Sequence, residues 1–183
     1  MDGKERPSLV QAQAVENMGQ QPLAKMELQD GKMVKIIPYK DSYKAPLIKL
    51  TLEWLEKYVS VEPEDELFLN NPDNYVSSKN GAIYLAQYDD DIVGTVALYR
   101  ISERNYELAK LSVTERYKGK RIGCALIEHG IETCRHWGAD TITLYTTKRL
   151  EAAYQLYLKY GFREVPGEIQ KYIESDTKMV LKI

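Results

Sequence analysis

Cysteine and histidine are scarce in this sequence, which contains only Cys124 and Cys134, and His129 and His136. Both cysteines fall on one predicted helix, about 15 Å apart at 1.5 Å per residue, which is too far for a disulfide between them. The cysteines and histidines also lack the paired spacing of zinc ligands. These absences argue against a disulfide-stapled fold and a structural zinc site, and we expect no bound metal.

Long apolar runs and an excess of either charge are also missing. No apolar run approaches the roughly 18 residues of a membrane-spanning helix, and the polar N-terminus lacks the apolar core of a signal peptide. Lys and Arg number 25 against 27 Asp and Glu, for a net charge of -2, which argues weakly against nucleic-acid binding. Because unpaired cysteines suit a reducing compartment, we expect a cytoplasmic protein without nucleic-acid or membrane partners.

The composition is that of a globular protein, with 183 residues of which 44% are hydrophobic and 28% charged. Such a chain can bury the core of one domain. Residues 1–32 are polar and show no convincing apolar period, so we predict a flexible N-terminal tail. The folded domain is expected over residues 33–183.

Apolar periodicity divides this domain into alternating elements. Strand patterns occupy seven segments: 34–39, 82–88, 92–99, 106–113, 141–146, 162–165 and 178–183. Helical patterns occupy about 42–58, 120–137 and 150–160, with one further turn within 61–80. The order predicts an α/β (α+β) fold, in which helices cover both faces of a mixed, mostly antiparallel central sheet of about six to seven strands.

The strand predicted at 106–113 carries an unusual carboxylate. Two-residue alternation assigns its side chains to two faces: Tyr106, Leu108, Lys110 and Ser112 on one, and Glu107, Ala109, Leu111 and Val113 on the other. Glu107 would then share a largely apolar face, where carboxylates are rare. Burial there would raise its pKa toward neutrality and suit it to act as a base. The alternative is that Glu107 forms an ion pair with a neighbouring cation or a helix end.

The stretch from Leu111 to Leu126 has the features of an anion site. It reads as a strand end, a basic loop containing Gly119, and the first turn of a helix at Gly123. The first N–H groups of a helix lack internal partners, and the aligned peptide dipoles favour negative charge there. Four cations lie within six residues: Arg116, Lys118, Lys120 and Arg121. We predict a phosphate or diphosphate ligand; the alternative is a surface loop with solvated charges.

Two motifs in this order resemble the GNAT superfamily of N-acetyltransferases. Lys118-Gly-Lys-Arg-Ile-Gly123, following the strand, is similar to the family's acetyl-CoA motif [Gln/Arg]-x-x-Gly-x-[Gly/Ala]. Leu156-Tyr-Leu-Lys-Tyr-Gly-Phe162 is similar to its Leu-Tyr-x-x-x-Gly-Phe ending. The resemblance covers residues 33–183 and implies the GNAT fold. The sequence departs from the family with Lys118 at the [Gln/Arg] position, Arg121 at the first motif glycine, and Thr147 where many relatives have Asn.

The resemblance implies transfer of an acetyl group from acetyl-CoA, as co-substrate, directly to a primary amine without an acyl-enzyme. The residues implied to bind acetyl-CoA are Leu111, Ser112, Val113, Lys118, Gly119, Lys120, Arg121, Ile122, Gly123, Cys124 and Tyr154. Arg121 could keep its backbone N–H available there with ordinary helical dihedral angles.

Two catalytic residues are implied. Tyr157 would protonate the leaving thiolate, and Glu107 would accept a proton from the amine. Against the first assignment, Tyr154, Tyr157 and Tyr160 recur at three-residue steps, and such a stripe usually packs in a core.

The partner implied is an acceptor amine, either a small molecule or a protein, and a homodimer is possible. The competing function is a GNAT-like module that binds acyl-CoA and regulates or scaffolds with little or no catalysis. The acidic runs Glu62–Glu66 and Asp89–Asp91 could attract a cationic amine, although such charges are more often a solvated surface.

Overall fold

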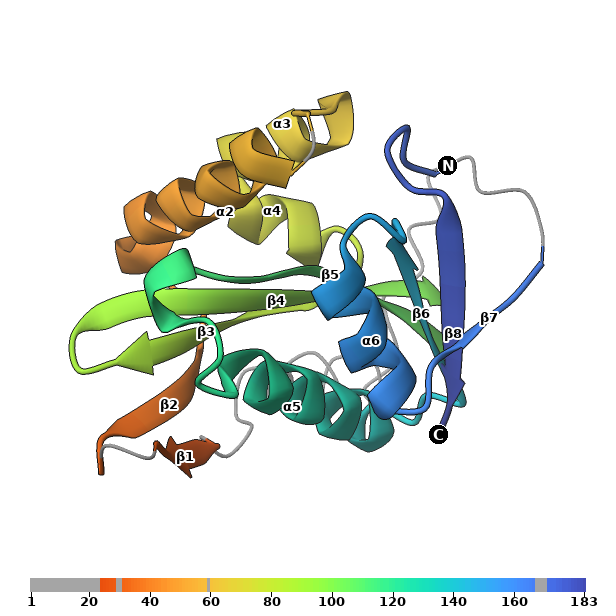
Figure 1. Cartoon of the computed structure of the whole chain (residues 1–183). Coiled ribbons are helices and arrows are strands. Elements are labelled where there is room, and N and C mark those ends of the chain that lie inside the picture. Colours follow the sequence, from red (N-terminus) through yellow and green to blue (C-terminus); the bar gives the residue numbers. More distant parts are fainter. Residues whose placement is uncertain (1–23, 29–30, 59, 167–170) are drawn as a thin grey trace, which may run out of the picture.

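The computed structural model describes residues 24–28, 31–58, 60–166 and 171–183. These residues form one sheet of eight strands in the order β1-β2-β3-β4-β5-β6-β8-β7 (Figure 1). The strands are β1 Lys25–Glu27, β2 Met33–Pro38, β3 Ala82–Tyr88, β4 Asp91–Ser102, β5 Asn105–Val113, β6 Thr141–Thr146, β7 Arg163–Glu164 and β8 Thr177–Lys182. Every neighbouring pair is antiparallel except β5 with β6. The predicted α/β fold class with a mostly antiparallel sheet is confirmed.

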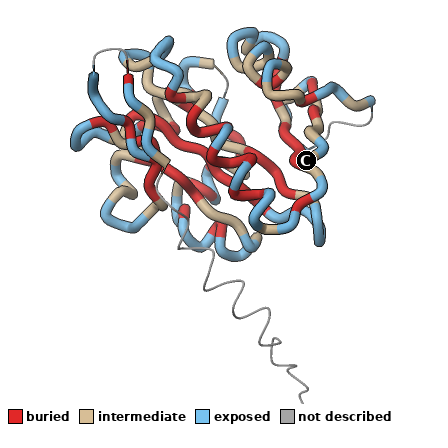
Figure 2. Tube along the Cα trace, turned by 90° about the horizontal axis from the view of Figure 1, so that it is seen from below, coloured by how far each residue is buried: buried red, intermediate tan, exposed pale blue. Residues whose placement is uncertain are grey.

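Helices cover both faces of this sheet. The helices are α2 Lys44–Tyr58, α3 Pro63–Asn70, α4 Pro72–Ser77, α5 Ile122–His136 and α6 Glu151–Lys159, with short 3-10 turns η1 Asp41–Tyr43 and η2 Glu115–Tyr117. Figure 1 shows α2, α3 and α4 on one side of the sheet and α5 on the other. Two buried clusters follow this division, one around Leu47 and Phe68 and the other around Leu126 and Tyr157. In Figure 2 the buried residues gather along the strands between these layers.

The sheet begins before the predicted domain boundary at residue 33. Strand β1, which lies within the segment predicted to be a tail, pairs with β2 in the register Met26↔Val34. Leu28 beside it is only 7% exposed. This strand accounts for the eighth member of the sheet, because each of the seven predicted segments is also found as a strand. Residues 1–23 lie outside the described part of the chain.

A β-bulge in β5 overturns part of the predicted alternation. The pairing with β4 passes from Thr95↔Ser112 to Ala97↔Ala109, so two residues of β5 oppose the single residue Val96. Lys110 in the bulge has a φ of 52°. One extra residue moves the following side chains to the opposite face.

The packing around β5 shows this change of face. Leu111 and Val113 contact the same core cluster as Leu108, whereas Ala109 contacts the cluster of Tyr99 on the other side. The prediction that Leu111 and Val113 share a face with Glu107 was therefore wrong.

Strands β5 and β6 pair over only three residues. The parallel register joins Asn105–Glu107 to Thr141–Thr143, and the described residues show no further pairing between the two strands. Beyond Glu107, the edge of β5 that faces β6 is therefore open, while its other edge stays bonded to β4. A pair of parallel strands that separates in this way leaves a row of backbone N–H and C=O groups available to a ligand.

Candidate active site

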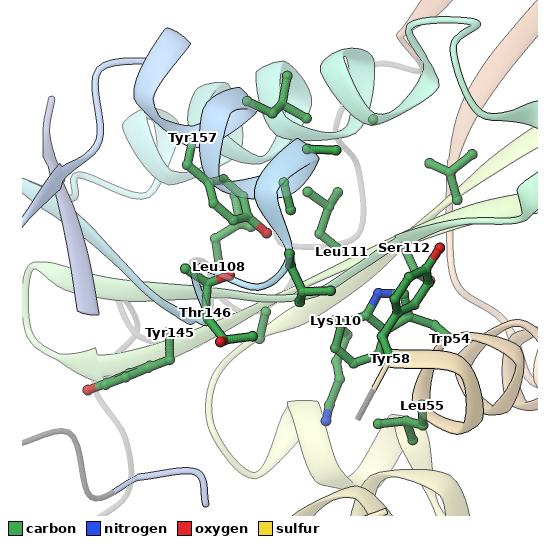
Figure 3. Close-up of a pocket in the computed structure, with 18 of the residues that line it drawn as sticks. Trp54, Leu55, Tyr58, Leu108, Lys110, Leu111, Ser112, Tyr145, Thr146 and Tyr157 are labelled. Carbon is green, nitrogen blue, oxygen red and sulfur yellow. The ribbon is translucent and has the colours of Figure 1, made fainter. Parts of the chain in front are cut away.

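A cavity of about 730 Å³ lies where β5 and β6 separate (Figure 3). Its wall combines the end of β5, the start of α5, the end of β6, α6, α2 and the segment 172–175. Eleven of the predicted site residues line it: Glu107, Leu111, Ser112, Val113, Lys118, Gly119, Arg121, Ile122, Gly123, Cys124 and Tyr157. The size is within the usual range for a small-molecule site, roughly 300–1,000 Å³.

Lys120 and Tyr154, also predicted to bind the cofactor, are not part of this wall. Tyr154 donates a hydrogen bond from its hydroxyl to Glu164, which also pairs with Lys148 at 2.9 Å. Tyr154 is partly buried and also packs against the cluster around Leu126 and Tyr157.

The start of α5 differs from the predicted geometry. The helix begins at Ile122 rather than near Lys120, and Arg121 before it has φ 63° and ψ 12°. The expectation of ordinary helical angles at Arg121 was therefore wrong. A left-handed conformation costs a residue with a Cβ about 1–2 kcal/mol, which explains why a glycine suits this position of the motif.

Backbone N–H groups gather at this helix start. The Ala125 N–H donates to the Arg121 carbonyl at 3.1 Å. The N–H groups of residues 122–124 therefore precede the first helical hydrogen bond. Arg121 occupies the N-cap position, and its side chain forms no capping hydrogen bond with the described residues. An anion would find both unpaired donors and the positive end of the helix dipole here.

The two loop glycines leave the backbone accessible. Gly119 has a φ of 77°, and a Cβ placed on it would meet nothing within 4 Å. A Cβ on Gly123 would lie 3.5 Å from Leu156 Cδ2, which is an ordinary contact. Gly119 is thus needed for its left-handed backbone, and neither glycine is required by packing against the protein itself.

The basic loop is tied to the end of α2. Lys118 pairs with Glu115 and donates to the Tyr58 hydroxyl at 2.7 Å. Tyr58 in turn donates to Glu115 at 2.7 Å, and Lys57 pairs with the same carboxylate at 3.0 Å. Hydrogen bonds from Lys118, Tyr58 and Lys57 lower the pKa of Glu115 to about 2. The sequence analysis did not assign Tyr58 or Glu115 to the site, because 57 residues separate them and neither belongs to the motifs at Lys118–Gly123 and Leu156–Phe162.

Tyr157 extends from α6 into the cavity (Figure 3). Its ring packs edge-on against Phe162, with the centroids 5.9 Å apart. Burial raises the pKa of the Tyr157 hydroxyl, and in the described part of the chain burial is the single cause. The phenol therefore stays protonated and can donate to a ligand atom in the cavity.

Glu107 is 1% exposed and lies at the point where β5 and β6 part. Its carboxylate forms an ion pair with Lys171 and accepts a hydrogen bond from the Tyr172 hydroxyl at 2.8 Å. Burial and the nearby Glu107 charge raise the pKa of Tyr172, so Tyr172 remains a donor. The ion pair foreseen as the alternative for Glu107 is present, and its partner is a residue that the sequence analysis did not identify.

Two carboxylates of the run Glu62–Glu66 are buried and bonded at the same end of the cavity. Glu62 accepts the backbone N–H groups of Ile173 at 3.1 Å and Glu174 at 2.9 Å. Asp65, 6% exposed, pairs with Lys110 of the bulge. These two acids therefore hold neighbouring chain segments in place. The expectation that this run is simply a solvated surface was wrong for them.

The family model described as the acetyltransferase (GNAT) family matches residues 47–162. An uncharacterized N-acetyltransferase of Mycobacterium tuberculosis is 33% identical over 89 residues, which cover 49% of this chain and 57% of that protein. The chain spans about half the length of the first curated relatives it matches.

Solved structures share the fold over most of the chain. A GNAT-family acetyltransferase from Staphylococcus aureus has a TM-score of 0.74 and 27% identity, covering 81% of this chain and 98% of its own. The PaiA N-acetyltransferase from Thermoplasma acidophilum, solved with coenzyme A, has a TM-score of 0.64 and 19% identity, covering 82% and 99%. No helix in the described ranges has the length and apolar character needed to span a membrane.

Proposed function

This chain belongs to the GNAT family of acetyltransferases, and from that premise we propose that it transfers an acetyl group from acetyl-CoA to a primary amine. The amine would attack directly within a complex that holds both substrates. The supporting observation is a single cavity that joins the open edge of β5, the N-terminus of α5, Tyr157 and Glu107. The CoA complex of the Thermoplasma relative supports the donor by its shared fold.

The donor would be bound mainly by backbone groups. The open edge at Leu111–Val113 can pair with the amide groups of a pantetheine arm, as an added strand would. The N–H groups at the start of α5, with Gly119 and Gly123 beside them, fit a diphosphate. Lys118 and Arg121 line the same part of the cavity and add positive charge.

The acceptor must lose a proton before it can attack. An amine with a pKa of about 10 is neutral in roughly one molecule per thousand at pH 7, which costs about 4 kcal/mol. Glu107 is the assigned base, because its carboxylate lines the cavity. This role requires that the acceptor amine take the place of Lys171, which pairs with Glu107 in the structure. Four residues further along β5, the Leu111 N–H can stabilise the oxygen of the tetrahedral intermediate.

Tyr157 would act on the leaving sulfur. A thiol has a pKa of about 8.5, below that of a phenol at about 10, and burial raises the pKa of Tyr157 further. Full transfer of the phenol proton to the thiolate is therefore uphill. We assign Tyr157 primarily as a hydrogen-bond donor that stabilises the developing thiolate.

The decisive experiment combines binding and turnover. Thermal shift with CoA should show stabilisation, and acetyl-CoA should release free thiol in the presence of at least one member of a panel of amines. Absence of any CoA-dependent shift would contradict the proposal. Stabilisation without thiol release on any amine would instead support an acyl-CoA-binding regulatory module.

A small-molecule or protein amine as acceptor, a cytoplasmic location and a possible homodimer are further proposals from the sequence. The acceptor panel tests the first of them, fractionation of cells that express the protein tests the second, and sedimentation of the purified protein tests the third.

A further inference from the structure

The strongest unexplained feature of the cavity is that its candidate base already holds an amine. The Lys171 ammonium pairs with Glu107, which is 1% exposed, although Lys171 lies 64 residues further along the chain. The Lys171 side chain itself is 34% exposed, so it reaches from the surface to a buried carboxylate. A flexible, strongly hydrated ammonium loses rotamer freedom and hydration in such a position, which requires a favourable receiving site.

Aromatic rings complete that receiving site. The Lys171 Nζ lies 5.5 Å from the ring centroid of Tyr145 and 5.3 Å from that of Tyr172. The two rings meet edge to face at 5.7 Å. A cation within about 6 Å of an aromatic centroid is attracted by the ring quadrupole. We name Glu107, Tyr145 and Tyr172 the ammonium cage.

The ammonium cage belongs to the same cavity as the proposed acetyl donor. All three cage residues line it, together with Leu111 and Tyr157. An ammonium placed in the cage therefore shares one continuous space with the groups assigned to the thioester. The cage also sits where β5 and β6 begin to separate, at the inner end of the open edge.

We propose that the ammonium cage is the acceptor-amine subsite, that it accepts an ammonium on an unbranched alkyl chain, and that Lys171 is an internal occupant which the acceptor displaces. This inference rests on the proposed function and gives it a substrate class. The present occupant is itself an alkylammonium, which is the chemistry proposed for the acceptor.

The charges around the cage discriminate among amines. Glu62 and Asp65 are buried acids that line the cavity together with Glu107. Lys110 pairs with Asp65, whereas the hydrogen-bond partners of Glu62 are the uncharged backbone N–H groups of Ile173 and Glu174, so the repulsion comes mainly from Glu62 and Glu107. An α-amino acid would bring a carboxylate next to its amine and meet like charge in a low-dielectric site, which is unfavourable. The preferred acceptor is therefore an alkylamine without an adjacent carboxylate, such as a lysine side chain or a simple aliphatic amine.

Displacement of Lys171 does not require the chain around it to leave. The backbone of Ile173 and Glu174 is bonded to Glu62. The Glu174 side chain is held by Arg149 at 2.8 Å and by Ser60 at 2.9 Å. The long lysine side chain can therefore swing out while the segment 172–175 continues to line the cavity.

Chemical rescue tests the cage without any catalytic readout. Lys171→Ala removes the ammonium and most of its alkyl stem, and n-propylammonium chloride should then raise the Tm of this variant while leaving the wild type unchanged. 1-Propanol, of similar size and uncharged, should not rescue it. The double variant Lys171→Ala, Glu107→Gln should lose the response. Equal responses of the wild type and Lys171→Ala, or rescue by propanol, would overturn the proposal.

Kinetics test displacement in the full enzyme. If Lys171 competes with the acceptor, Lys171→Ala should lower the KM for n-butylamine by roughly tenfold, because the competent state is no longer occupied internally. Lys171→Arg, which keeps a cation, should not lower it, and glycine should stay a poor acceptor for all forms. Should Lys171→Ala fold poorly, Lys171→Met retains the length of the stem without the charge and should give the same decrease.

The two proposals fail in different ways. A KM for n-butylamine that is unchanged in both Lys171→Ala and Lys171→Met, with CoA binding and thiol release intact, would overturn the cage and leave the acetyltransferase assignment standing. Failure of the wild type to bind CoA would overturn the proposed function. Selective rescue of Lys171→Ala by propylammonium would in that case still support the cage as an ammonium site.

Discussion

Single residues three positions apart on α6 have different environments. Tyr157 is buried, lines the cavity and packs against Phe162, whereas the Tyr154 hydroxyl is bonded to Glu164 outside the cavity. The spacing of tyrosines along the helix does not separate the two, because both fit an aromatic stripe. The motif Leu156–Phe162 includes Tyr157 and not Tyr154, so it distinguishes two positions that the spacing alone does not.

Tyr157→Phe should lower kcat by about 100-fold, because the variant loses the hydrogen bond assigned to the developing thiolate. Its unfolding free energy should change by less than about 0.5 kcal/mol, since the hydroxyl has no hydrogen-bond partner among the described residues. Steady-state thiol release and thermal melts measure the two effects. Tyr154→Phe is the matched control and should leave kcat and the KM for acetyl-CoA unaltered. Equal turnover of the Tyr157 variant and the wild type would remove Tyr157 from the mechanism.

Arg121→Gly should be more stable than Arg121→Ala by about 1 kcal/mol, because only glycine adopts the observed φ of 63° without a Cβ penalty. Both substitutions remove the same charge, so the comparison isolates the backbone. Urea denaturation of the two variants measures the difference. If Arg121→Ala were equally stable, the left-handed geometry before α5 would carry no cost.

At the scale of elements, the bulge in β5 is a feature that the sequence does not predict. The alternation of apolar residues predicts the strand at 106–113 correctly, and it assigns the faces correctly from Tyr106 to Ala109 but not beyond the bulge. It does not predict the bulge, because Lys110 is neither glycine nor asparagine and so carries no local signal for φ 52°. The bulge arises from the pairing of β5 with β4, which is a tertiary property. The partners of Glu107 escaped prediction for the same reason, since Lys171 and Tyr172 lie more than 60 residues away.

The contact between α2 and the basic loop should make the stability of the fold depend on pH. The folded-state pKa of Glu115 is lowered to about 2, so its contribution to stability is present above the unfolded pKa of about 4.3 and is lost as the pH falls toward 2. Glu115→Gln should therefore lower the Tm at pH 6 and converge with the wild type near pH 2. Melting curves of both proteins between pH 2 and 6 measure this. Curves that stay parallel over the whole range would show that the network does not stabilise the fold.

At the scale of the whole molecule, the order of elements was the most predictable property. Each of the seven segments predicted as strands is a strand, and the helical patterns correspond to α2, α5 and α6. The N-terminal boundary of the domain was less predictable, because β1 has only three residues and is too short to show an alternation of apolar and polar side chains. Its pairing with β2 becomes visible only when the sheet is assembled.

Deletion of residues 1–32 should therefore lower the Tm, because it removes β1 and Leu28 and exposes the edge of β2. The unfolding free energy should fall by about 1–3 kcal/mol from the loss of the buried Leu28 alone. Deletion of residues 1–23 is the control and, given their polar composition, should leave the Tm unchanged. An unaltered melting curve after the longer deletion would show that β1 contributes nothing to the sheet.

The three-residue junction of β5 with β6 also has a mechanical consequence. Among the inner strands of the sheet the shortest pairing is that of β5 with β6, where Asn105–Glu107 connects the five strands β1–β5 with β6, β8 and β7. Local opening takes place where few hydrogen bonds must break, so the two parts of the sheet should fluctuate against each other about this junction. A donor bound along the open edge would bridge them. Amide hydrogens of β6 and β8 should then exchange more slowly with CoA present, while those of β3 keep their rates. The bound donor would replace the hydrogen bonds that β5 and β6 do not make with each other beyond Glu107.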